Sequence, residues 1–142
     1  MSDVTVLYRR PGSRGEQQAP VGSVAEVKAL ANDLRSAHHD HGYTAFPGIA
    51  LVRGNPQAPD ESIAIGVSDG GWAMIHSDAE VNQLSTRAGS DVPNGPMITV
   101  LFDQPDDIPA TWFIPEERAL SAVDAWLTGN GVDREIFVGP DC

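Results

Sequence analysis

The stretch Ser62–Ser77, SIAIGVSDGGWAMIHS, has the strongest local pattern in the sequence. Two apolar runs flank Asp69-Gly70-Gly71, a combination typical of the tight turn of a β-hairpin. Because side chains alternate along a strand, a two-residue loop of Asp69 and Gly70 places six of them on one face, in the pairs Val67–Trp72, Ile65–Met74 and Ile63–His76. A three-residue loop would scatter these side chains. The pattern therefore predicts both the hairpin and its register.

The segment before the hairpin indicates a strand at 4–8, a loop at 11–22, a helix and a second strand at 49–52. Ser23 and Glu26 fit a capping box at the start of the helix. The apolar stripe of this helix is Val27, Leu30, Ala31 and Leu34. We expect a frayed end at His38–His41 and a left-handed stop at Gly42.

After the hairpin, residues 78–96 are polar and turn-rich, and 97–102 form an apolar strand pattern. We expect an acidic loop at 103–107, a short strand at 111–114, a helix from Pro115 to Gly129 and a last edge strand at 133–138. Hairpin connections dominate this order. The sequence thus predicts one α+β domain over residues 1–142, a curled, mainly antiparallel sheet packed with two α-helices.

Charge is strongly unbalanced: nine Lys and Arg face twenty Asp and Glu among 142 residues, a net charge of −11. Residues 1–59 have a net charge of +1 and residues 60–142 a net charge of −12. Such a surface repels phosphate backbones, so we expect no direct nucleic-acid binding. It attracts a basic partner, unless the acidity serves solubility alone.

The expected compartment is the cytoplasm. The N-terminal MSDVTVLYRRPG lacks the apolar segment of a secretory signal, and the apolar stretches are too short to cross a membrane. The lone Cys142 has no partner for an intramolecular disulfide.

Catalytic patterns are weak, so we expect a non-enzymatic chain without cofactor or metal. Gly66-Val67-Ser68-Asp69-Gly70 matches G-x-S-x-G, but that motif needs a helix after the turn, and here a strand is predicted. A small hydrolase or metal-dependent enzyme that uses His38, His41 and His76 stays an alternative, as does an acidic regulatory subunit.

Three tryptophans bear on binding. Trp126 belongs to the helix stripe and is expected in the core, whereas Trp72 and Trp112 are either core residues or interface anchors. The acidic loop and the acids at the helix start would meet a basic partner. The candidate partner-binding residues are Asp103, Asp106, Asp107, Trp112, Glu116, Glu117 and Trp72.

The order of motifs over residues 48–140 resembles a known family. The hairpin ESIAIGVSDGGWAMIHSD precedes MITVLFDQPDDIPATWFIP and a Pro-started helix ending in Leu-Thr-Gly. This order is similar to immunity protein 1 of actinobacterial polymorphic toxin systems, with comparable positions at Pro115, Ala119, Ala122, Trp126 or Leu127, Gly129 and Ile136. The resemblance implies a non-enzymatic inhibitor of a co-encoded toxin, often a nucleic-acid deaminase.

Overall fold

The computed structural model describes residues 4–13, 15–80, 82–87, 95–102 and 104–138. Within these ranges the chain forms two α-helices, nine strands and one 3₁₀ turn. In chain order the elements are β1 Val4–Tyr8, β2 Gln17–Pro20, α1 Val24–Asp40, β3 Phe46–Asn55, β4 Ala58–Val67, β5 Trp72–Asp78, β6 Gln83–Thr86, β7 Met97–Leu101, β8 Pro105–Pro109, η1 Ala110–Trp112, α2 Glu116–Leu127 and β9 Phe137–Val138.

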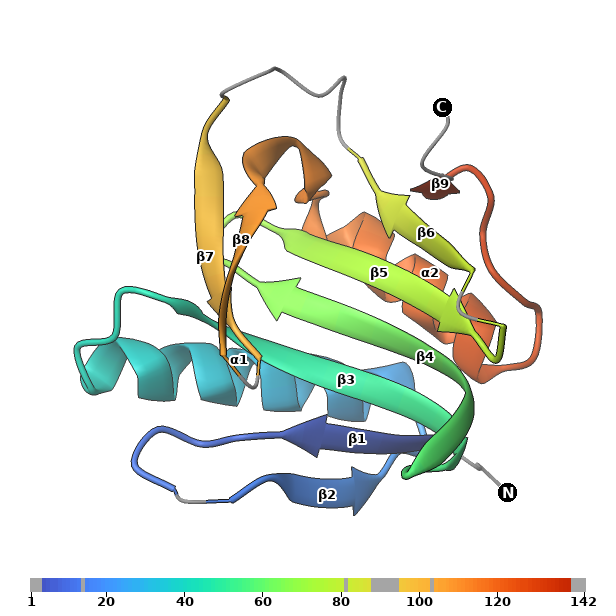
Figure 1. Cartoon of the computed structure of the whole chain (residues 1–142), viewed down its shortest axis with the longest axis horizontal. Coiled ribbons are helices and arrows are strands. Elements are labelled where there is room, and N and C mark those ends of the chain that lie inside the picture. Colours follow the sequence, from blue (N-terminus) through green and yellow to red (C-terminus); the bar gives the residue numbers. More distant parts are fainter. Residues whose placement is uncertain (1–3, 14, 81, 88–94, 103, 139–142) are drawn as a thin grey trace.

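The elements are arranged in three layers. Seven strands form an antiparallel path in the order β2-β1-β3-β4-β5-β6-β9. Both helices cover one face of this sheet, and the β7–β8 hairpin crosses the opposite, front face (Figure 1). β7 joins the sheet through a short parallel pairing with Phe46 and Pro47 of β3. The predicted α+β class, with a curled, mainly antiparallel sheet and two helices, is confirmed.

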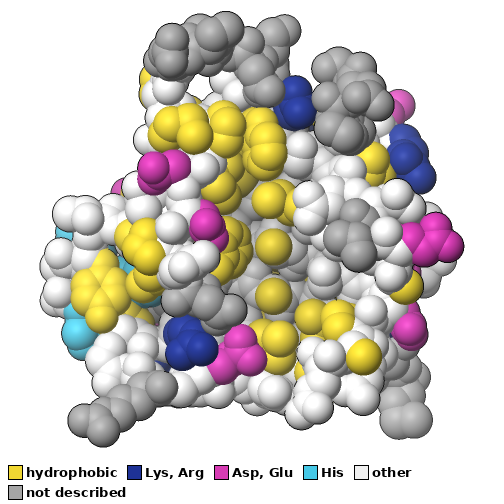
Figure 2. Space-filling view, viewed as in Figure 1, with side chains coloured by type: hydrophobic (Ala, Val, Ile, Leu, Met, Phe, Trp, Pro, Cys, Tyr) yellow, Lys and Arg dark blue, Asp and Glu magenta, His cyan; other side chains and the backbone are white. Residues whose placement is uncertain are grey.

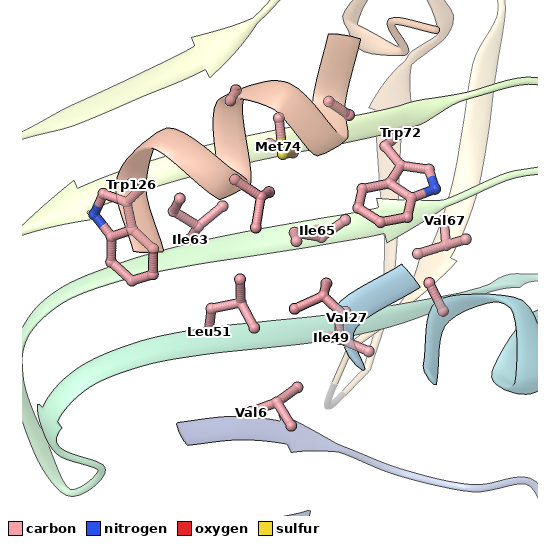
Figure 3. Close-up of a cluster of buried hydrophobic side chains, with 14 of the residues drawn as sticks. Val6, Val27, Ile49, Leu51, Ile63, Ile65, Val67, Trp72, Met74 and Trp126 are labelled. Atoms are coloured by element: carbon pink, nitrogen blue, oxygen red, sulfur yellow. The ribbon is translucent and has the colours of Figure 1, made fainter. Parts of the chain in front are cut away.

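The predicted hairpin register is also confirmed. Val67 pairs with Trp72, Ile65 with Met74 and Ile63 with His76. All six side chains are buried on the helix-facing side, where Figure 3 shows the apolar ones beside Val27 of α1 and Trp126 of α2. Because α1 and α2 cover this face, the hairpin forms the floor of the main core.

Two glycines let the β7–β8 hairpin approach the front face closely. Gly48 and Gly66 pair across β3 and β4. A Cβ at Gly48 would collide with the ring of Phe102, and one at Gly66 would lie 2.8 Å from a methyl of Val100. A small second core of Ala73, Val100 and Ile108 results. Elsewhere on this face, Figure 2 shows apolar side chains along the middle of the sheet.

Two strands lie where the sequence indicated loops. β2 falls within the expected loop 11–22 and pairs with β1, and β6 falls within the polar segment 78–96 and pairs with β5. Both are four residues long and lie toward the borders of the sheet. These two strands are formed by backbone hydrogen bonds to their neighbours. Because such bonds do not require apolar side chains, the sequences of β2 and β6 lack the apolar alternation that would have predicted them.

Three C-terminal expectations were wrong in detail. The expected loop 103–107 enters a strand at Pro105, so Asp106 and Asp107 belong to β8. In place of a strand at 111–114, the 3₁₀ turn η1 precedes a single bridge between Ile114 and Trp72. In the region 133–138, only Phe137 and Val138 form a strand, paired with β6.

The helix ends differ partly from the expected ones. Ser23 makes no side-chain cap, and the Glu26 carboxylate instead accepts a 2.9 Å hydrogen bond from the Gly22 N–H. α1 is helical through His38 and His39 to Asp40, and His41 is its C-cap. Gly42 and Gly129 have φ of 73° and 85°, the left-handed stops expected of them. Neither helix in the described ranges is long and apolar enough to cross a membrane.

The strands at the borders of the sheet are short or bounded by proline. β2 ends at Pro20, β9 has two residues, and β8, which pairs with β7, begins at Pro105 and ends at Pro109. Proline has no N–H to offer to a neighbouring strand.

Candidate functional site: a pocket at the hairpin turn

The structure brings together three of the predicted site residues. Trp72, Glu116 and Glu117 line one pocket of about 420 Å³, which we call the turn pocket. Its other walls come from the hairpin turn Ser68–Gly71, from Pro115 and from Arg35 of α1.

The remaining predicted site residues do not line this pocket. Asp106 and Asp107 are exposed on β8, where the Asp107 carboxylate accepts a 2.7 Å hydrogen bond from the Thr99 hydroxyl. Trp112 is half-buried against the second core, and its carbonyl accepts a hydrogen bond from Thr86. Asp103 lies outside the described residues.

The floor of the turn pocket is a two-residue turn closed by hydrogen bonds between Ser68 and Gly71. The Ser68 N–H donates to the Gly71 carbonyl at 3.0 Å, and the Ser68 hydroxyl donates to the same oxygen at 2.7 Å. The Gly71 N–H in turn lies 3.1 Å from the Ser68 hydroxyl oxygen. Residue 71 must be glycine, because a Cβ there would collide with the carbonyl of Ile114.

Ile114 fixes the second wall. Its backbone exchanges two hydrogen bonds with Trp72, each 2.9 Å between nitrogen and oxygen. The chain then passes through Pro115, the N-cap, directly into α2. Glu116 and Glu117 therefore lie in the first helical turn beside the hairpin, where the helix dipole stabilises negative charge.

Arg35 of α1 closes the third side. Its guanidinium donates to the Ser68 carbonyl at 3.4 Å and lies 3.8 Å from the Asp69 carboxylate. Asn32 holds the same guanidinium through a 3.0 Å hydrogen bond. With three acids (Asp69, Glu116 and Glu117) against one arginine, the lining of the turn pocket has a formal charge of −2.

Two polar atoms at this site are buried and have no hydrogen-bond partner among the described residues. They are the indole nitrogen Nε1 of Trp72 and the carboxylate oxygen Oε1 of Glu116. The whole Trp72 side chain is 0% exposed. It is a core residue, one of the two interpretations that the sequence left open, and it also lines the turn pocket.

Sequence reasoning missed Arg35 and Asp69 as site residues. The sequence pattern predicts only a turn role for Asp69, and Arg35 lies on the helix thirty-four residues earlier. No spacing motif links the two. Their proximity results from the packing of α1 beside the end of the β4–β5 hairpin.

The three histidines of the enzyme alternative make hydrogen bonds to different residues, Ala45 for His38, Ala37 for His41 and Glu61 for His76. His38 is buried, and its Nδ1 lies 3.1 Å from the Ala45 carbonyl. Burial lowers the pKa of His38, and the charge of His41 lowers it further, whereas the hydrogen bond to Ala45 raises it. The pKa is lowered overall. His76 lies 2.8 Å from Glu61. Within the described ranges, no three His, Cys, Asp or Glu side chains gather as metal ligands.

A second polar cluster surrounds Glu61, at the end of β5 that is remote from the turn. One carboxylate oxygen of Glu61 accepts from Trp126 Nε1 at 3.0 Å and lies 2.8 Å from His76 Nε2. Arg53 stacks over the Trp126 ring at 4.4 Å from its centroid. Burial alone would raise the pKa of Glu61, but the hydrogen bonds from Trp126 and His76 and the charges of His76 and Arg53 lower it. These contacts tie α2 to the sheet.

Comparisons of the chain with protein-family models, with curated proteins and with solved structures found no match.

Proposed function

We propose that this chain is a cytoplasmic immunity protein that binds and neutralises a co-encoded toxin. The toxin would act on nucleic acid, as a deaminase does, and the chain would occlude its basic active-site cleft. The observation that supports this proposal is the turn pocket, where the hairpin turn holds Asp69 and the first turn of α2 holds Glu116 and Glu117 around one opening. A toxin cleft that grips phosphates presents Arg and Lys, which such carboxylates complement.

The internal pairing of the arginines adds support. Arg10 lies 2.6 Å from Asp33, Arg35 contacts Asp69, and Arg53 lies 3.7 Å from Glu61. These cations are engaged with acids of the same chain. Asp106 and Asp107 are exposed to solvent, where negative charge accelerates the encounter with a basic protein.

Co-expression tests the proposal. The partner is the C-terminal toxin domain encoded by the neighbouring gene, produced with and without this chain. We expect restored growth of the host and a complex that survives gel filtration. A folded chain that neither restores growth nor co-elutes with the toxin domain would contradict the proposal.

Charge reversal supplies a matched control for that experiment. Glu116→Lys with Glu117→Lys should abolish protection, whereas Asp124→Lys with Glu135→Lys changes the net charge equally at exposed positions outside the turn pocket. The second pair should leave protection largely intact. Equal loss in both variants would indicate that net charge alone, and no defined site, governs binding.

A further inference from the structure

We infer that the turn pocket receives a loop of the protein partner, with an arginine side chain bound to Glu116 and a carbonyl oxygen of the same loop bound to the indole N–H of Trp72. The inference rests on the proposed function, because it takes the partner to be a basic protein. It goes further in naming the group that enters and the two atoms that hold it.

Trp72 supplies the donor. Its ring is packed in the main core and 0% exposed, yet its indole nitrogen has no partner among the described residues. Figure 3 shows this nitrogen on the side of the ring turned away from Ile65 and Met74, toward the turn end of the hairpin. A buried N–H without an acceptor is costly, and a ligand oxygen in the turn pocket would remove that cost.

Glu116 supplies the acceptor. One oxygen of its carboxylate is buried without a partner among the described residues, although the residue as a whole is half-buried. Glu117 and the largely exposed Asp69 line the same opening. Several carboxylate oxygens around one space suit a guanidinium, which offers five N–H donors in a fixed plane.

Size and charge select among ligands. A volume of about 420 Å³ is within the usual range of small-ligand sites and admits backbone as well as a side chain. The formal charge of −2 opposes phosphate and carboxylate ligands. A glutamine side chain could form hydrogen bonds with both Trp72 Nε1 and Glu116 Oε1, but it would leave the negative charge of the pocket uncompensated. An arginine with a neighbouring carbonyl therefore fits best.

The test is a titration followed by ¹H–¹⁵N NMR of the indole N–H groups. The probe is the peptide Ac-Gly-Arg-Gly-NH₂, and the comparison peptides have Gln or Leu in place of Arg. The Trp72 signal is assigned in the unaltered protein by through-bond and through-space correlations. We expect a saturable downfield shift of the Trp72 indole proton with the Arg peptide and no shift of Trp126, whose indole already donates to Glu61.

Variants locate the acceptor. Glu116→Gln should weaken binding of the Arg peptide about tenfold, the scale of a lost charge-assisted hydrogen bond. Asp124→Asn, an equal charge change at an exposed α2 position outside the turn pocket, should leave the affinity within about twofold.

Three results would overturn the inference. They are an unmoved Trp72 signal with every peptide, an equal shift with the Gln and Arg peptides, or equal weakening by the two variants. A toxin complex that forms despite an unmoved Trp72 signal would overturn the pocket assignment alone. Conversely, a specific Arg titration without any toxin complex would overturn the proposed function and leave the pocket assignment in place.

Discussion

Ile114 and Trp72 exchange both of their backbone hydrogen bonds, at 2.9 Å each, outside any regular pairing of strands. This single bridge joins the start of β5 to the residue before Pro115. The bridge therefore ties the N-terminus of α2 to the hairpin turn and joins two walls of the turn pocket.

Gly71→Ala should destabilise the protein by about 2 kcal/mol or more, because the added methyl meets the backbone carbonyl of Ile114 and must push the bridge apart. Gly70→Ala is the matched control, since a Cβ there has open space around it. Urea denaturation of both variants measures the difference. Equal stability of the two would show that the bridge tolerates displacement.

Ile65→Asp should lower the free energy of unfolding by roughly 3–5 kcal/mol, because it places an unpaired charge among the buried side chains of the main core. Ala64→Asp is expected to cost much less, since Ala64 points to the partly open front face. Thermal melts of both variants measure this asymmetry. The reverse order of stability would mean that the faces of the hairpin are exchanged.

Replacing Asp103, Asp106 and Asp107 together by Asn should slow association with the toxin domain about tenfold at low salt. The melting temperature should hardly change, because Asp106 and Asp107 are exposed on β8. Stopped-flow association rates across a salt series provide the measurement. If neither the association rate nor its dependence on salt changed, these three acids would have no part in the association with the toxin domain.

Acid should weaken the Glu61 cluster. The pKa of Glu61 lies below its ordinary value of 4.5 in the folded chain, so its contribution to stability is complete above that pH and is lost as pH falls through the folded value. Glu61→Gln should lower the free energy of unfolding by about 1 kcal/mol at pH 7, a modest amount because the carboxylate is partly exposed. The loss should be smaller at pH 3, where the native carboxylate is closer to neutral. Urea midpoints at both pH values measure the change. A difference independent of pH would contradict the ionised pairing.

His38 should add a second acid-sensitive step at higher pH. Its pKa is lowered from 6.5 in the folded chain, chiefly by burial, so the unfolded chain binds a proton first as pH falls below 6.5. The melting temperature should fall between pH 7 and pH 5. His38→Gln should reduce that dependence, whereas His39→Gln at an exposed position should not.

Elements whose own side chains follow an apolar or turn pattern could be predicted from the sequence. Ile63, Ile65 and Val67 alternate, and Asp69-Gly70 fits only a tight turn, so the hairpin and its register followed. β2 and β8 were missed because neighbouring backbone, not their own apolar pattern, makes them strands. The turn pocket was missed as a unit because Arg35, Asp69 and Glu116 meet only through the packing of three elements.

The borders of the sheet have a consequence for association. Pro20 ends β2, and Pro105 and Pro109 begin and end β8, where none of them offers an N–H to an incoming strand. β9 is two residues long, which is a short template. A fibre-like stacking of copies through added strands is thereby disfavoured. A protein partner would therefore bind through side chains on the surface and in pockets. The selectivity for that partner would then depend on individual side chains, each of which a single mutation can change.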